Sequence, residues 1–103
     1  MSQYETSMNF DLENVPIFLE RLNSNFDLGM AVVELTKNVA GVPLDAEKSW
    51  SIAVEHRGEK TDLRIGAFMD DIDAPDLYFF SDSEALIELI DEELERFADE
   101  KGM

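Results

Sequence analysis

Cysteine is absent from this chain of 103 residues, and histidine occurs once, as His56. Disulfides and thiolate chemistry are therefore excluded, and His56 has neither a cysteine nor an HExxH partner for a metal or nucleophile site. The five glycines form neither a GxGxxG motif nor a P-loop. We expect no catalytic residues, no metal, no cofactor and no enzyme activity.

Basic residues are also scarce, with 8 lysines and arginines against 24 acids and a net charge of -16. This charge is about twice the upper end of the range of roughly 2 to 8 that is usual for a small soluble domain. Such a surface repels nucleic acids and anionic membranes, which bind proteins through lysine and arginine. The composition therefore predicts no direct contact with nucleic acid or membrane, and a basic protein as partner.

Long apolar runs and a basic, apolar leader are missing as well, so we expect a cytoplasmic protein. The length fits one domain, residues 1–103, with a single modest core. An apolar content of 45% argues against disorder despite the charge.

Two stretches in the first half carry apolar residues at helical spacing. The first, NVPIFLERL, predicts a helix over about residues 14–23 with Asn14 as its N-cap. The second predicts a helix over 28–40 that stops at Gly41, but its β-branched residues leave a strand through 31–35 open.

Alternation of apolar and polar residues around Gly58 predicts an antiparallel hairpin. A type II′ turn centred on Gly58 and Glu59 gives three apolar pairs on one face, Val54 with Leu63, Ile52 with Ile65, and Trp50 with Ala67. A third strand is expected over 76–80, and whether SMNF near the N-terminus adds an edge strand stays open.

The segment from 82 to 100 predicts an amphipathic helix, capped by Ser81 with Glu84 completing a capping box. Its apolar arc comprises Leu86, Ile87, Ile90, Leu94, Phe97 and Ala98. The opposite arc is acidic and comprises Glu84, Glu88, Asp91, Glu92, Glu95 and Asp99. The predicted fold class is therefore α+β, with an antiparallel sheet of three or more strands, helices packed on one face and a C-terminal acidic amphipathic helix.

The acidic arc places like charges four residues apart, which together cost the helix roughly 1 to 2 kcal/mol at low salt. Residues 62–103 hold 14 acids and 3 bases, whereas residues 1–61 hold 10 acids and 5 bases. Salt adaptation of a solvated surface predicts a more uniform spread. The concentration of charge slightly favours a recognition surface over solvation.

The loop DDIDAPD resembles a calcium loop only superficially, because Pro75 and Asp76 stand where an EF-hand needs a ligand and a glycine. A polar turn set by Pro75 and Asp76 is the preferred interpretation. Phe68 falls on the sheet face opposite Leu63 and Ile65, where it is either an interface residue or covered by another helix.

Our leading hypothesis is a small acidic binding protein that masks or inhibits a basic protein partner, of the toxin-immunity or nuclease-inhibitor type. A DNA mimic is one version of it, because acids along the last helix recur at about the spacing of backbone phosphates. The alternative is an acidic secretion-type chaperone, a possible homodimer with exposed apolar surface at Leu89, and a salt-adapted domain of unrelated function stays open. The expected partner-binding residues are Glu84, Glu88, Asp91, Glu92, Glu95, Asp99, Asp70, Asp71, Asp73, Asp76 and Phe68.

Overall fold

A computed structural model describes residues 4–26, 32–56, 58–71 and 73–102 of the chain. Four antiparallel strands form one sheet in the order β1-β4-β3-β2. The elements in chain order are β1 (Tyr4–Asn9), a 3-10 turn η1 (Leu12–Asn14), α1 (Val15–Phe26), α2 (Val32–Ala40), β2 (Glu47–His56), β3 (Glu59–Phe68), β4 (Asp76–Ser81) and α3 (Glu84–Lys101). The α+β prediction is confirmed.

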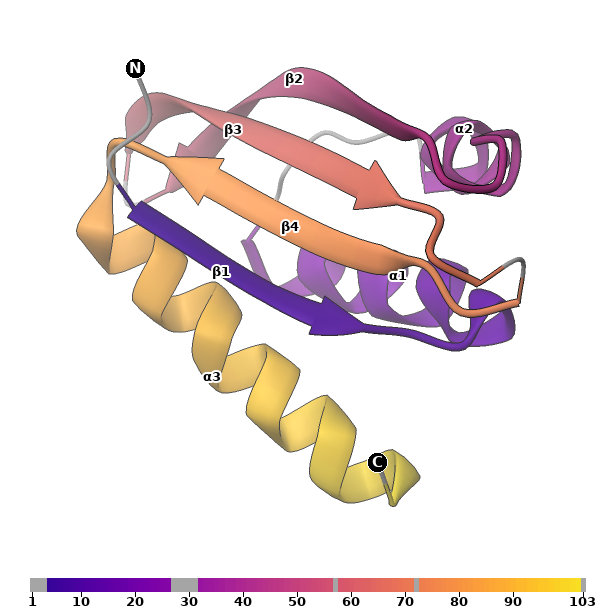
Figure 1. Ribbon diagram of the computed structural model, residues 1–103. Coiled ribbons are helices and arrows are strands. Elements are labelled where there is room, and N and C mark those ends of the chain that lie inside the picture. Colours follow the sequence, from indigo (N-terminus) through magenta and orange to yellow (C-terminus); the bar gives the residue numbers. More distant parts are fainter. Residues whose placement is uncertain (1–3, 27–31, 57, 72, 103) are drawn as a thin grey trace.

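The helices α1 and α3 lie against the same face of the sheet, and α2 packs against α1 near the beginning of β2 (Figure 1). No helix is drawn over the other face of the sheet in the described part of the chain (Figure 1). The sheet therefore has an inner face, which carries the core, and an outer face.

The inner face carries the apolar side chains that alternation predicts. Leu63, Ile65 and Ala67 of β3 are buried and lie opposite Ser81, Phe79 and Leu77 of β4. Burial of apolar side chains contributes about 1.5 to 3 kcal/mol each, and this row forms the floor of the core. The predicted apolar stripe of the first helix covers it, because its four members are fully buried: Val15, Phe18, Leu19 and Leu22.

Four phenylalanines meet where the two helices cross the sheet. The ring of Phe18 in α1 lies 5.1 Å from that of Phe10, 5.3 Å from that of Phe97 in α3 and 5.9 Å from that of Phe79 in β4, measured between centroids. Tilted and edge-on contacts at such distances stabilise aromatic pairs beyond simple burial. Phe18 therefore joins both helices to the sheet.

Two predictions that the sequence left open are decided by the structure. The segment predicted over 28–40 is helical from Val32 to Ala40, so a strand over its described residues is wrong, while residues 28–31 lie outside the described part. SMNF contributes to β1, which forms an edge of the sheet beside β4. Asn14, the predicted N-cap, is the last residue of η1 and lies buried directly before Val15, the first residue of α1.

The hairpin forms between the predicted segments, but its predicted register is wrong by two residues. Val54 lies opposite Thr61, and Ile52 lies opposite Leu63, because the last pair before the turn is His56 with Glu59, and Gly58 in the turn has a φ of 79°. The predicted register would have placed Glu55 opposite Asp62, whereas the observed one places it opposite Lys60. Opposite charges across a pair are favourable and like charges are not.

The predicted cap of the last helix is also wrong. Ser81 belongs to β4 and is buried, and its hydroxyl donates to the Asp62 carbonyl oxygen and accepts from Ser83 N, both at 3.1 Å. Ser83 is the N-cap, and its hydroxyl accepts from Leu86 N at 3.3 Å. Because Ser81 is part of β4, it does not cap the helix, and α3 begins at Glu84, two residues later than predicted.

Candidate functional site

The acidic arc of α3 faces solvent along the whole helix. All six of its predicted members are exposed, namely Glu84, Glu88, Asp91, Glu92, Glu95 and Asp99. The apolar arc is turned to the core, with Leu86, Ile90 and Phe97 at most 1% exposed. Asp91 accepts a hydrogen bond from the Thr6 hydroxyl of β1 at 2.7 Å. Helical periodicity alone places these acids correctly.

Two other acids of α3 contact Arg21 of α1, and the sequence predicts neither contact: Glu93 is buried, whereas the Glu100 side chain is 57% exposed. Glu93 is 5% exposed and accepts from Arg21 Nε of α1 and from Arg96 Nη1, both at 2.8 Å. Arg21 also forms an ion pair with Glu100. The sequence carries a signal for Glu93, because it lies three residues after Ile90 and four before Phe97, within the apolar stripe.

The contacts with Glu93 and Glu100 change the pKa of the Arg21 guanidinium. Its pKa is raised above the ordinary arginine value, chiefly by the hydrogen bond to Glu100, with Glu93 also contributing and burial opposing. The same guanidinium lowers the pKa of the Glu100 carboxyl. The arrangement is thus an internal ion-pair network that ties α1 to the C-terminal half of α3.

Glu93 forms ion pairs with Arg21 and Arg96, and Glu100 forms one with Arg21. None of the six acids of the outer arc forms an ion pair with another residue in the described part of the chain. Because Glu93 is buried, it is also missing from the phosphate-like row of exposed acids that a DNA mimic needs.

The acidic loop lies at the opposite end of the sheet from the beginning of α3, because β4 runs between them (Figure 1). Asp71 closes the turn, since its carboxylate accepts from Asp73 N at 3.1 Å and its carbonyl from Ala74 N at 3.0 Å. Asp76 is already in β4, so the expectation that Pro75 and Asp76 set the turn is wrong. The loop acids and Glu84 therefore do not form one patch.

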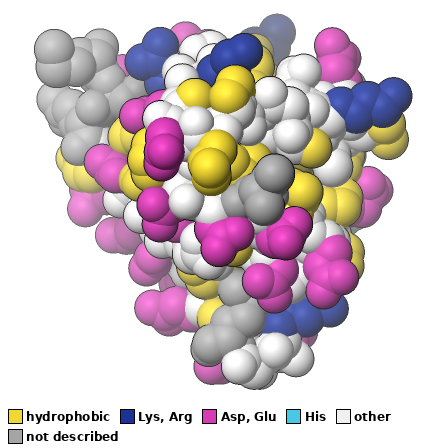
Figure 2. Space-filling model, turned by 45° about the vertical axis from the view of Figure 1, so that its right-hand side comes forward, with side chains coloured by type: hydrophobic (Ala, Val, Ile, Leu, Met, Phe, Trp, Pro, Cys, Tyr) yellow, Lys and Arg dark blue, Asp and Glu magenta, His cyan; other side chains and the backbone are white. Residues whose placement is uncertain are grey.

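The loop instead borders the segment before α1. Leu12 N donates to the Asp73 carbonyl oxygen at 2.7 Å, and a shallow hollow is lined by Asp11, Leu12, Glu13 and Asp73. Acidic side chains spread over much of this end of the molecule, with apolar side chains between them (Figure 2). No three acidic or histidine side chains among the described residues are placed to hold a metal ion.

The outer face of the sheet carries an aromatic group, which we call the aromatic ledge and define as Phe68, Tyr78 and Phe80. Each of the three is half-buried, although no described helix covers them. The position of Phe68 on this face agrees with the prediction. The sequence did not place Tyr78 and Phe80 there, because LYFF is apolar at every position and gives no alternation to follow.

Within the ledge, two rings are stacked. The rings of Tyr78 and Phe80 are 6.2 Å apart between centroids and inclined by 15°. Phe80 leans over Gly66, where an added Cβ would lie 3.5 Å from its ring carbon Cε2. A side chain larger than alanine at Gly66 would collide with this ring. Glycine at position 66 therefore leaves the space above β3 that the Phe80 ring fills.

Carboxylates surround the ledge and act on Tyr78. The pKa of the Tyr78 phenol is raised, first by burial and then by the negative charges of Asp76, Glu47, Glu5 and Asp70. We call these four acids the carboxylate rim. Because the folded protein favours the neutral phenol, Tyr78 contributes stability below the ordinary tyrosine pKa and loses it as the pH rises through the raised value.

Asp76→Asn is expected to lower the pKa of Tyr78 toward the ordinary tyrosine value, because Asp76 makes the largest electrostatic contribution to the shift. A pH titration of the Tyr78 ring carbons by NMR measures this directly. The matched control is Asp99→Asn, which removes one charge from the outer arc of α3 and should leave the titration unchanged. Equal effects of the two variants would show that net charge, rather than the rim, governs Tyr78.

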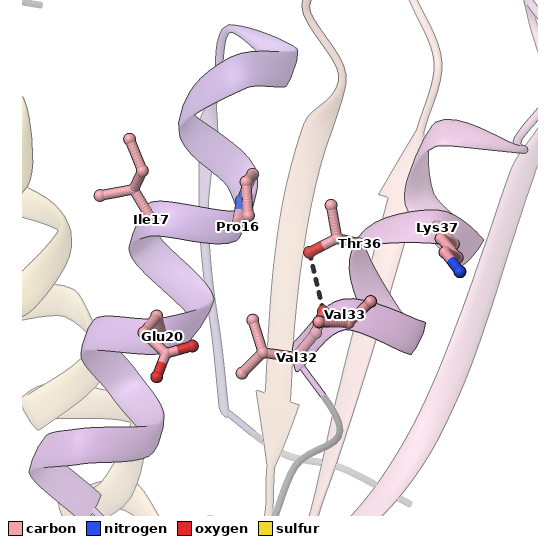
Figure 3. A pocket seen from close by; sticks show the side chains of 7 residues that line it. All are labelled: Pro16, Ile17, Glu20, Val32, Val33, Thr36 and Lys37. Carbon is pink, nitrogen blue, oxygen red and sulfur yellow. Dashed lines mark hydrogen bonds between the residues drawn. The ribbon is translucent and has the colours of Figure 1, made fainter.

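An apolar groove of about 650 Å³ separates α1 from α2. Val32 points from α2 toward α1, whereas Lys37 points away from it (Figure 3). Ile17 and Val33 leave 47% and 69% of their surface exposed. The remaining lining residues are Pro16, Glu20 and Thr36. Leu89, the other predicted apolar contact, is half-buried on α3.

Comparison with family models, curated proteins and solved structures finds no significant match to this chain. No helix in the described part is long and apolar enough to cross a membrane. What this chain binds is therefore inferred from the chemistry of the surfaces described above.

Proposed function

We propose that this protein binds a basic protein partner and masks or inhibits it, without being an enzyme. The observation that carries the proposal is the outer arc of α3, whose six acids are exposed and form no ion pair with another described residue. Like charges four residues apart weaken a helix, so an arc of this kind is stabilised when a cationic surface covers it. A nuclease or a toxin with a basic active site presents such a surface.

The acids of α3 would act mainly on the rate of association. Complementary fields steer encounters and raise association rates by about 10 to 1,000-fold at low salt, while added salt screens the effect. The acidic loop extends the same negative field to the other end of the sheet. The proposed location is the cytoplasm.

Neutralising Glu88, Glu92, Glu95 and Asp99 as the amides is expected to slow association about tenfold at low salt and to flatten its salt dependence. The partner is first captured from a lysate of the native source at about 50 mM salt and identified, and rates are then measured by stopped flow up to about 500 mM. The changes relieve repulsion within the helix, so instability would not explain a loss.

The matched control neutralises four acids elsewhere, Glu20, Glu34, Asp45 and Glu55, all of them exposed. Both variants then carry the same net charge. Equal slowing in both would assign steering to total charge rather than to α3. Failure of the native protein to capture any basic protein would contradict the proposal and favour salt adaptation of the surface.

A secretion-type chaperone remains the second candidate, because the groove between α1 and α2 exposes Ile17 and Val33. The same experiment separates the two functions. A partner segment held in an apolar groove stays bound as salt rises, since screening does not weaken apolar burial.

A further inference from the structure

The outer face of the sheet brings aromatic and acidic side chains together in three rows that cross all four strands. In the first row Glu5 neighbours Phe80, and Phe80 neighbours Arg64. The second row places Tyr78 beside Gly66. The full rows, read from β1 to β2, are Glu5-Phe80-Arg64-Ser51, Ser7-Tyr78-Gly66-Ser49 and Asn9-Asp76-Phe68-Glu47.

These rows are aromatic at the centre and acidic at the margins. Phe80, Tyr78 and Phe68 occupy the two central strands, and three acids stand against one basic residue, Arg64. The electrostatic influence of all four rim acids on Tyr78 shows that their charges reach the ledge. The face therefore offers π-surface and negative charge within one site.

Arginine is the side chain that can bind both the aromatic rings and the carboxylates of this face. Its guanidinium stacks on aromatic rings and donates in pairs to carboxylates, and it is more weakly hydrated than the lysine ammonium. Its removal from water against a half-buried ring is accordingly less costly. A purely apolar partner would leave the rim without a counter-charge.

We propose that the outer sheet face is the docking site for an arginine of the basic partner, with the guanidinium over the Tyr78 and Phe80 rings and against the carboxylate rim. This inference deepens the proposed function and rests on it. A second copy of the chain does not fit, because it would bring two rims of equal sign together. Single-stranded nucleic acid would stack on the rings, but its phosphates are repelled.

The test uses three synthetic octapeptides of alternating glycine and a second residue, which is arginine, lysine or citrulline. Each is titrated into the full chain and followed by ¹⁵N and aromatic ¹³C NMR. We expect the arginine peptide to shift the signals of Phe68, Tyr78 and Phe80. Its affinity should exceed that of the lysine peptide by about three- to tenfold, and citrulline should bind most weakly, because it keeps the shape without the charge.

Phe80→Leu keeps apolar volume and removes the ring, so it should weaken the arginine peptide about three- to tenfold and the lysine peptide less. Phe80 faces away from the core, and an unchanged pattern of core methyl signals verifies folding. Glu34→Gln on α2, an exposed acid outside both the ledge and the outer arc, is the control and should leave the ledge shifts in place. Asp76→Asn removes a rim charge and should weaken both cationic peptides.

Shifts confined to α3, or equal arginine affinity in the native protein and Phe80→Leu, would overturn the docking site. That failure differs from failure of the proposed function. In the first case a captured basic partner binds Phe80→Leu as well as the native chain, and in the second no basic protein is captured at all. Equal binding of arginine and lysine peptides would also overturn the assignment of arginine.

Discussion

Phe18→Ala is expected to lower the free energy of unfolding by about 3 to 5 kcal/mol, the largest loss from any single change described here. Phe18 is fully buried, and its ring meets those of Phe10, Phe79 and Phe97. Alanine removes the ring and leaves a cavity between both helices and the sheet. Domains of this size have about 5 to 15 kcal/mol of stability in total, so partial unfolding is expected at warm temperatures.

Urea denaturation followed by far-UV circular dichroism measures the loss. Ile17→Ala, at the next position of α1, is the matched control, because 47% of the Ile17 surface is exposed and its loss should stay within about 1 kcal/mol. A loss below about 1.5 kcal/mol for Phe18→Ala would show that the four rings do not pack as described.

Arg21→Met is expected to cost about 2 kcal/mol, because it leaves the buried Glu93 carboxylate with only the exposed Arg96 as a partner. Breaking a fully buried pair costs roughly 3 to 5 kcal/mol, and the value here is lower because the Arg21 side chain is 26% exposed and Arg96 remains. Thermal and urea denaturation of the variant measure this loss.

Arg96→Met is the control, since it removes the other hydrogen bond to Glu93 from a side chain that is 63% exposed. It should cost less than about 1 kcal/mol. Combining Arg21→Met with Glu93→Leu should recover much of the stability, because no buried charge is then left without its partner. Equal losses for Arg21→Met and Arg96→Met would contradict the role given to burial.

The periodicity of apolar residues predicts the helices and the inner face of the hairpin, because both follow from the order of residues within one short segment. The observed hairpin register pairs Glu55 with Lys60, a favourable cross-strand charge pair that a turn motif does not reveal. The N-cap of α3 is Ser83 rather than Ser81, because Ser81 is buried in β4 and its hydroxyl donates to the Asp62 carbonyl oxygen. Tertiary context overrides local preference in both cases.

The candidate site divides in the same way. The exposure of the acidic arc follows from helical spacing, and so does the position of Phe68 from strand alternation. Helical spacing places Glu93 within the apolar stripe, but the partner that makes its burial tolerable, Arg21, lies 72 residues away in the sequence and is not revealed by local pattern. Tyr78 and Phe80 could not be assigned to a face until β4 was paired with both of its neighbours.

The strand order has a consequence for how the chain acquires its structure during synthesis. β1 pairs with β4, and the paired residues are 67 to 77 positions apart, from Asn9 with Asp76 to Tyr4 with Ser81. The strands β2 and β3 are adjacent in the sequence and can pair as soon as both are made. In contrast, β1 leaves the ribosome long before β4 has been synthesised. Closing so long a loop is entropically costly. β1 is therefore the last strand able to join the sheet, although it is the first to be translated.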